Sequence, residues 1–168
     1  VGQPEYDAGL AAGLRAKGDG IKSFVCVNHV ISNTVVAERC RGFADGLGIK
    51  LGNSMMDSGQ DPSEIKNRVL AYLSAHPNTD AILTLGPTSA DPTIAALKEN
   101  GMAGDIYFGT FDLGTEIVKA IKSGIIMWGI DQQPFLQAYL PVVVLANYDR
   151  YGVLPGNNIN SGPGFVTK

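Results

Sequence analysis

The chain has 168 residues, of which 45% are hydrophobic and 17% charged, and its formal net charge at pH 7 is −3. This length suffices for one globular domain with its own core and is too short for two sizeable ones. Basic residues are scattered singly, without the Lys/Arg cluster that a nucleic-acid-binding face needs. No apolar run approaches the roughly 20 residues that cross a bilayer. We therefore expect no nucleic-acid partner and no membrane insertion.

Helix-like and strand-like segments alternate along the chain, because apolar residues at helical spacing are followed repeatedly by short apolar runs. In chain order, the expected elements are a helix at 5–16, a strand at 21–28, a helix at 33–47, a weak strand at 49–56, a helix at 63–76, a strand at 80–86, a helix at 91–100, a strand at 105–112, a helix at 114–124, a strand at 125–131 and a long apolar helix at 135–151. The Gly-, Pro- and Asn-rich tail predicts a loop with room for one short edge strand.

The strands read as continuous apolar runs, which indicates burial on both faces. Together with the strand–helix alternation, this predicts an α/β fold with three layers, α/β/α, around a mostly parallel sheet of about five to six strands. No linker divides the chain, so residues 1–168 are expected to form one unit.

The two cysteines, Cys26 and Cys40, lie in a strand-like and a helix-like segment. The favoured interpretation is two buried thiols that pack as small hydrophobes. A disulfide between them is the alternative in an oxidising compartment. No CxxC or His/Cys cluster predicts a metal site.

Catalytic signatures are missing from the sequence. It has two histidines, no GxSxG or GxxxxGK[ST] motif, and no GxGxxG after the first strand. Without an activated nucleophile, a carboxylate pair or a phosphate loop, we expect neither an enzyme nor a cofactor.

Polar groups follow the strands at their carboxyl ends, where open α/β sheets bind ligands. These exits contain Asn28 and His29, then Gly86, Pro87, Thr88 and Ser89, then Asp112, and finally Asp131, Gln132 and Gln133. Amides and carboxylates with one nearby Arg suit hydroxyl groups better than phosphate, since an amide both donates and accepts while a carboxylate accepts two donors.

Three motifs carry a family resemblance: "VVAERCRGF", "YFGTFD" and "GIDQQP". In order and spacing the sequence resembles the C-terminal lobe of type I periplasmic sugar-binding proteins, the ribose-binding-like group that serves sugar ABC transporters. The opening "VGQPEYDAGLAAG" is similar to the segment that has just crossed the hinge in that family, and "LPGNNINSGPGFVTK" resembles the returning tail. The resemblance implies that 1–168 is the C-terminal lobe of a two-lobe clamp, without its N-terminal lobe.

The resemblance also implies site residues. Arg39 takes the position of an arginine that donates two hydrogen bonds to sugar oxygens. Asp112 takes the position of an aspartate that accepts hydrogen bonds from two hydroxyls. Gln132 takes the position of an amide at the far edge of the sugar. Asn33 is an additional contact, and Glu5 lies in the hinge segment.

One position departs from the family pattern. Relatives carry Asn-Asp after the third strand, whereas this chain has Gly86 and Pro87. An amide contact is therefore missing, and Thr88 or His29 is expected to replace it.

Each candidate has a structural alternative. Arg39 could pair with Glu38 or Glu116 on the surface, Asp112 could only cap the following helix, and His29 could be a hydrogen-bonded structural residue. Ligand contact is favoured for Arg39 and Asp112 but not for His29. Trp128 is expected in the core, whereas Phe135 and Tyr6 are better placed to reach a cleft.

The resemblance implies a periplasmic, or lipid-anchored extracytoplasmic, receptor for a sugar or polyol, recognised in its closed form by a membrane permease. The alternative is the effector-binding core of a lac-repressor-like transcription regulator, which shares the fold and the sugar site.

Overall fold

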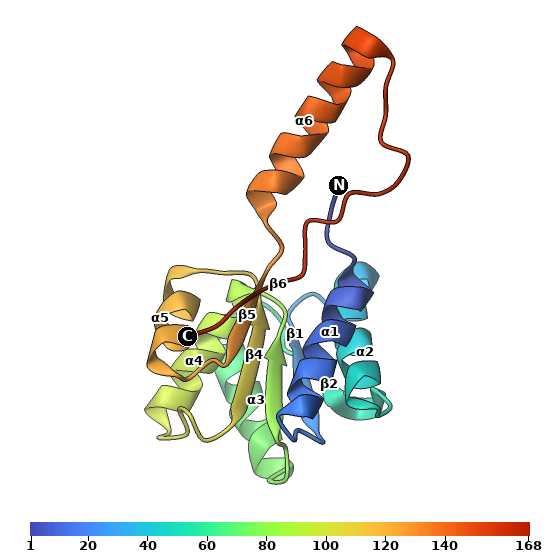
Figure 1. Cartoon of the computed structure of the whole chain (residues 1–168). Coiled ribbons are helices and arrows are strands. Elements are labelled where there is room, and N and C mark those ends of the chain that lie inside the picture. Colours follow the sequence, from blue (N-terminus) through green and yellow to red (C-terminus); the bar gives the residue numbers. More distant parts are fainter.

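A six-stranded sheet with the order β2-β1-β3-β4-β5-β6 forms the centre of the molecule (Figure 1). The computed structural model describes all of residues 1–168. The strands are β1 (Phe24–Asn28), β2 (Met55–Asp57), β3 (Ala81–Thr84), β4 (Tyr107–Phe111), β5 (Trp128–Asp131) and β6 (Gly164–Val166). Strands β1 to β5 are parallel, and β6 is antiparallel to β5. The expected mostly parallel α/β sheet is confirmed.

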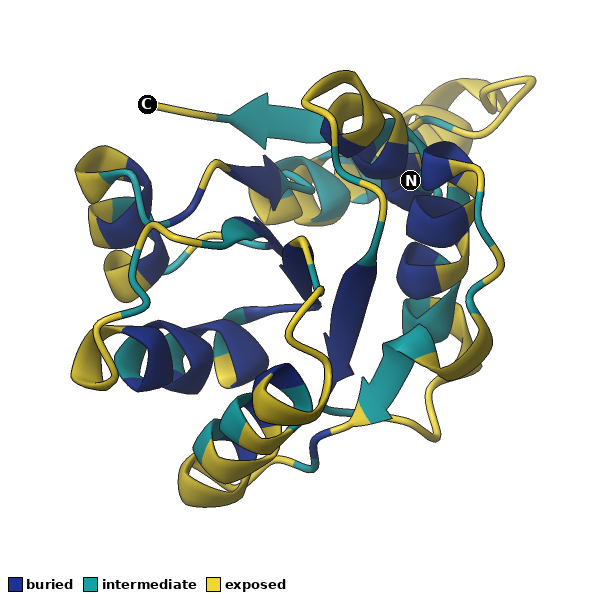
Figure 2. Ribbon diagram, turned by 90° about the horizontal axis from the view of Figure 1, so that it is seen from below, coloured by how far each residue is buried: buried dark blue, intermediate teal, exposed yellow.

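Helices cover both faces of this sheet. They are α1 (Glu5–Gly18), α2 (Thr34–Leu47), α3 (Pro62–Ala75), α4 (Pro87–Glu99) and α5 (Thr115–Ser123), followed by α6 (Pro134–Tyr151). α1 and α2 pack on one face with Phe24 and Cys26, whereas α3, α4 and α5 pack on the other with Val25 and Val27. Burial is concentrated along the strands and on the inward sides of these helices (Figure 2). The three-layer prediction is therefore confirmed.

Two elements, α4 and β2, differ most from the expected ranges. α4 begins at Pro87 rather than near Asp91, because proline fits the first helical position, where its missing N–H costs no hydrogen bond. Thr88 and Ser89 therefore lie in the first turn of a helix. The weak strand expected at 49–56 shrinks to β2, preceded by a short 3-10 turn, Gly52–Ser54.

Four glycines let α1 and α2 approach backbone to backbone. A Cβ atom on Gly42 would lie 2.1 Å from the carbonyl oxygen of Tyr6, and one on Gly9 would lie 2.3 Å from that of Arg39. The other two glycines at this contact are Gly13 and Gly46. The close approach fixes the start of α1 beside the middle of α2, which matters for the site described below.

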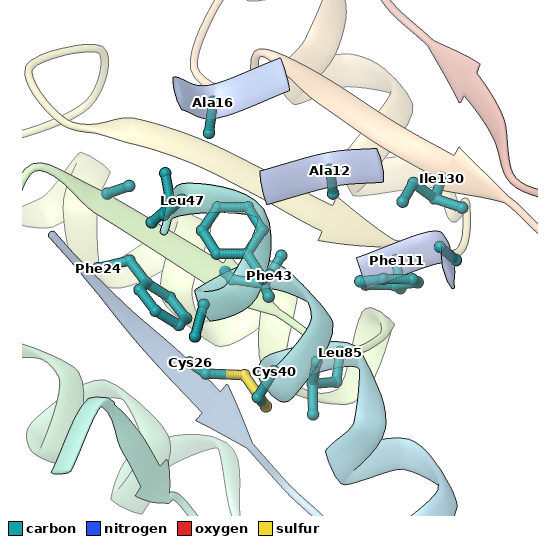
Figure 3. Packing of buried hydrophobic residues seen from close by; sticks show 14 of the residues in the cluster. Ala12, Ala16, Phe24, Cys26, Cys40, Phe43, Leu47, Leu85, Phe111 and Ile130 are labelled. Carbon is teal, nitrogen blue, oxygen red and sulfur yellow. A yellow bond between two sulfur atoms is a disulfide. The ribbon is translucent and has the colours of Figure 1, made fainter. Parts of the chain in front are cut away.

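Cys26 of β1 and Cys40 of α2 form a disulfide (Figure 3). The favoured interpretation of two free thiols is wrong. Packing of α2 on the sheet brings the two Cα atoms to 5.9 Å, within the span that a disulfide bridges. Both cysteines are fully buried, and the bond joins β1, the second strand from one edge of the sheet, to the helix that carries Arg39.

The core contains Trp128, as expected, and its ring is fully buried. It fits because Gly109 on the neighbouring strand β4 has no side chain; a Cβ atom there would lie 2.1 Å from the indole. The indole N–H donates to the hydroxyl of Tyr107 at 2.8 Å.

α6 does not cover the sheet. It projects away from the three layers at the end where the parallel strands finish (Figure 1), and none of its residues is buried. Apolar side chains lie in the open, with Phe135 74% and Val142 66% exposed. No helix combines the length and the hydrophobicity of a bilayer-crossing segment.

Candidate functional site

The carboxyl ends of β4 and β5 and the packed helices α1 and α2 bring four predicted site residues into one connected group. Nε2 of Gln132 donates to Oδ1 of Asp112 at 2.5 Å. Oδ2 of Asp112 lies 3.9 Å from Nη1 of Arg39, whose guanidinium is also paired with Glu5. We call Glu5, Arg39, Asp112 and Gln132 the rim cluster.

Arg39 is held almost entirely by the protein. Its Nε and Nη2 donate to the two carboxylate oxygens of Glu5 at 2.6 and 2.9 Å, and Nη1 donates to the carbonyl of Leu85 at 2.8 Å. The guanidinium carbon lies 4.5 Å from the ring centroid of Phe111, a cation–π distance. Three of the five N–H groups are thus engaged, which leaves two for another partner.

The alternative pairings of Arg39 are wrong. Glu38 pairs with Arg41, and Glu116 pairs with Lys119 at 2.7 Å. Arg39 turns inward instead, because α2 packs against α1 at their glycine contact and places its guanidinium beside Glu5.

Asp112 leaves β4 with a left-handed backbone, φ 63°, which Asp tolerates better than most residues. It does not cap the next helix: the N-cap of α5 is Gly114, without a side-chain hydrogen bond. Burial raises the pKa of Asp112, while the hydrogen bond from Gln132 and the charge of Arg39 oppose that rise. Asp112 is thus partly buried, and only its Oδ1 takes part in a side-chain hydrogen bond.

Of the polar residues after β5, Gln132 is the one that reaches the rim cluster. Gln133 also has a left-handed backbone, φ 57°, at the start of α6, and its N–H donates to the carboxylate of Asp131 at 2.8 Å. Asp131 thus shapes the turn that the opening of α6 requires.

His29, in the loop after β1, lies beside Gly86. A Cβ atom on Gly86 would lie 3.5 Å from Cε1 of His29 and 3.6 Å from Oδ2 of Asp112. Nδ1 of His29 is 3.2 Å from Oγ of Ser89. Burial, followed by the charge of Arg39, lowers the pKa of His29, while Asp112 raises it. The gap left by Gly86 is therefore bordered by an imidazole and a carboxylate.

Asn33 and Thr88 are not brought into the rim cluster. Asn33 caps α2, accepting from the N–H groups of Val35 and Val36 at 3.1 Å each. Thr88 is exposed in the first turn of α4. Neither side chain hydrogen-bonds to a member of the cluster.

Sequence reasoning missed the residues that support Gln132. Nε2 of Gln137 lies 2.9 Å from the carbonyl oxygen of Gln132 and 2.9 Å from Oγ of the buried Ser161. Gln137 could have been suspected from its place one turn into the helix after Gln132, but nothing in the sequence singles out Ser161.

Three chain segments run side by side next to the rim cluster: the first residues, the β5–α6 connection and the returning tail (Figure 1). The N–H of Gly2 donates to Ile159 at 3.1 Å, and the N–H of Ser161 donates to Gly2 at 3.0 Å. Gln137 links Ser161 to Gln132, as above. No group of three or more His, Cys, Asp or Glu side chains is positioned to hold a metal ion.

The sequence matches the family model described as a periplasmic binding protein domain over residues 1–150. It is 28% identical to "Xylose/arabinose-binding protein XylF" of Sulfolobus acidocaldarius, an alignment that covers 99% of this chain and 44% of that protein. A solved carbohydrate transporter from Acidothermus cellulolyticus, in complex with myo-inositol, is 31% identical with a TM-score of 0.85, over 99% of this chain and 58% of that one. A periplasmic sugar-binding protein from Legionella pneumophila is 27% identical with a TM-score of 0.82, over 95% and 60%. The chain spans about half the length of these relatives.

Proposed function

Since the chain belongs to the periplasmic binding protein domain family, we propose that it binds a small sugar or polyol as part of an ABC-transporter solute receptor. The observation that carries the proposal is the convergence of Asp112, Gln132 and Arg39 at one edge of the sheet. The carboxylate of Asp112 accepts hydrogen bonds from hydroxyls, the amide of Gln132 can donate or accept, and two guanidinium N–H groups of Arg39 stay free to donate. Relatives named for xylose, arabinose or myo-inositol support the substrate class.

We propose further that this chain acts as one lobe of a two-lobe clamp. The relatives are much longer than this chain. α6 carries exposed apolar residues on a helix that buries nothing, and exposed apolar surface of this kind marks a contact surface. The three adjacent segments beside the rim cluster are the connections between lobes in this proposal; Gln132 follows β5, and Glu5 begins α1.

The proposed location is outside the cytoplasm, either in the periplasm or lipid-anchored. The buried Cys26–Cys40 disulfide supports it, because such bonds persist in oxidising compartments. The same bond speaks against the alternative, an effector-binding core of a transcription regulator in a reducing cytosol. The partner in transport would be a membrane permease that recognises the closed clamp. A binding protein, rather than an enzyme, also agrees with how the relatives are named.

Calorimetry on two proteins tests the proposal. One is this chain, and the other is a chimera in which the remaining lobe of the Acidothermus cellulolyticus relative is fused before Val1. Because a single lobe leaves the sugar half solvated, we expect millimolar or weaker affinity for this chain and at least tenfold tighter binding by the chimera. Arg39→Met in the chimera should abolish that gain. Equal affinities of chain and chimera would refute the two-lobe proposal, and no binding by either would refute the sugar proposal.

A further inference from the structure

We propose that His29 presents an unprotonated Nε2 beside the Asp112 carboxylate, so that the site selects ligands with two neighbouring hydroxyl donors. The proposal rests on the sugar-binding function proposed above and adds a specificity residue to it. It concerns the gap at Gly86, where the family pattern predicts an amide that this chain does not have.

The hydrogen bonds of Ser89 determine which ring nitrogen of His29 carries the hydrogen. The Ser89 hydroxyl donates to the carbonyl of Gly86 at 3.2 Å and accepts from the N–H of Leu85 at 3.3 Å. A hydroxyl has one hydrogen, and with that hydrogen assigned to the Gly86 carbonyl, all three contacts of Ser89 are satisfied when Nδ1 of His29 donates across the 3.2 Å contact. In a neutral imidazole the other nitrogen, Nε2, is then an acceptor.

The surroundings of His29 keep the ring neutral near pH 7. The charged groups that face it are the Arg39 guanidinium on α2 and the Asp112 carboxylate after β4, and its neighbour on α4, Ser89, is uncharged. Burial and Arg39 together outweigh Asp112, so the pKa of His29 lies below its ordinary value.

The missing side chain of Gly86 marks a point that borders both acceptors. Its missing side chain would lie 4.0 Å from Nε2 of His29 and 3.6 Å from Oδ2 of Asp112. A group seated over Gly86 therefore meets an imidazole acceptor on one side and a carboxylate acceptor on the other. Two adjacent hydroxyls satisfy both, whereas an amide in place of Gly86 would supply a donor and fill the same space.

Nitrogen-15 NMR of the 168-residue chain tests the inference, with D-xylose and myo-inositol as probes at concentrations high enough for millimolar binding. In the free protein we expect the His29 hydrogen on Nδ1. On titration, the Nε2 resonance should shift as it accepts a hydroxyl hydrogen. His29→Leu should weaken binding about tenfold, the loss of roughly one hydrogen bond. His29→Gln, which keeps an acceptor near the Nε2 position, should retain most of the affinity.

The outcomes separate this inference from the function on which it rests. A sugar that binds while His29→Leu keeps full affinity overturns the role of His29 and leaves the function standing. A hydrogen on Nε2 of His29 also overturns the proposed role of this residue. The tautomer is measured on the unaltered chain, so this test does not depend on the folding of a variant. If neither sugar shifts any resonance of the unaltered chain or of the two-lobe chimera, both proposals fall.

Discussion

Arg39 and Glu5 form a two-pronged ion pair between α2 and α1, with Nε and Nη2 each donating to one carboxylate oxygen. The side chains are 6% and 16% exposed, so the pair is largely removed from water. Arg39, which is expected to contact a ligand, is therefore already held in place by its ion pair with Glu5. The pair fixes the plane and position of the guanidinium and leaves two of its N–H groups without a hydrogen-bond partner in the protein.

Glu5→Gln should therefore destabilise the fold. It removes one charge and leaves the buried Arg39 guanidinium without its main partner, which costs about 3 kcal/mol for a pair this buried. Urea unfolding measures the loss. Glu116→Gln, which breaks the exposed pair with Lys119, is the matched control and should change little. Equal effects of the two substitutions would mean that burial of the Arg39 pair has no energetic consequence.

Asp112→Asn should not lower the stability at pH 7, although it should weaken sugar binding. Burial raises the pKa of Asp112 in the folded state, so the stability associated with this group is present below the ordinary Asp value of about 4 and is lost as pH rises through the raised pKa. Asn cannot ionise, so the variant does not lose this stability as pH rises, and Asn also tolerates the left-handed backbone. We expect the variant to be at least as stable as wild type at pH 7, with the difference shrinking at pH 4.

Urea unfolding at both pH values tests this expectation. A variant less stable than the natural chain at pH 7 would show that the contacts of Asp112 with Gln132 and Arg39 outweigh its burial.

Gly42→Ala should disrupt the contact of α1 with α2. The added Cβ atom would lie 2.1 Å from the Tyr6 carbonyl, a backbone atom that cannot move without shifting α1. We expect a loss of about 3 kcal/mol, the upper part of the range for overpacking. Gly18→Ala, at the end of α1 with nothing within 4 Å of the new atom, should be neutral or slightly stabilising. A neutral Gly42→Ala would contradict the backbone-to-backbone contact.

Reduction of the Cys26–Cys40 disulfide should lower the free energy of unfolding by about 3 kcal/mol, as expected for opening a closed loop of some 15 residues. Unfolding with and without dithiothreitol measures the change. The Cys26→Ala/Cys40→Ala variant should have the same free energy of unfolding as the reduced protein, and dithiothreitol should not change it. Identical curves for the natural chain in both conditions would argue that the bond does not form.

Val142→Gln should leave the thermal stability of this chain within about 0.5 kcal/mol of wild type, because α6 buries none of its residues. The same substitution should destabilise the two-lobe chimera, where the helix has a partner. Val69→Gln, at a fully buried position of α3, should destabilise both proteins by about 3 kcal/mol. Indifference of the chimera to Val142→Gln would count against α6 as a contact between lobes.

Local pattern predicted the fold well because each strand is a continuous apolar run and each helix has one apolar stripe. It predicted α6 as an apolar helix but not that this helix projects away from the sheet with none of its residues buried. It also failed for Cys26 and Cys40, since a strand residue and a helix residue 14 positions apart become neighbours only after α2 docks on the sheet.

The candidate site was partly predictable for a similar reason. Parallel strands must present their exits at one edge, so the meeting of Asp112 and Gln132 follows from topology. The pairing of Arg39 with Glu5 depends on the glycine contact between α1 and α2. The role of Ser161 depends on the tail, which returns to the site only after α6. Such contacts between distant segments leave no local pattern.

The position of β6 has a consequence for biosynthesis. After β5 the polypeptide leaves the sheet for all of α6 and the tail, and it returns only at Gly164–Val166 to pair antiparallel with β5. Until that stretch emerges from the ribosome, the hydrogen-bonding edge of β5 is uncovered and open to other strands. The nascent chain would thus be most vulnerable to aggregation through β5 in the interval after this strand has formed and before β6 pairs with it.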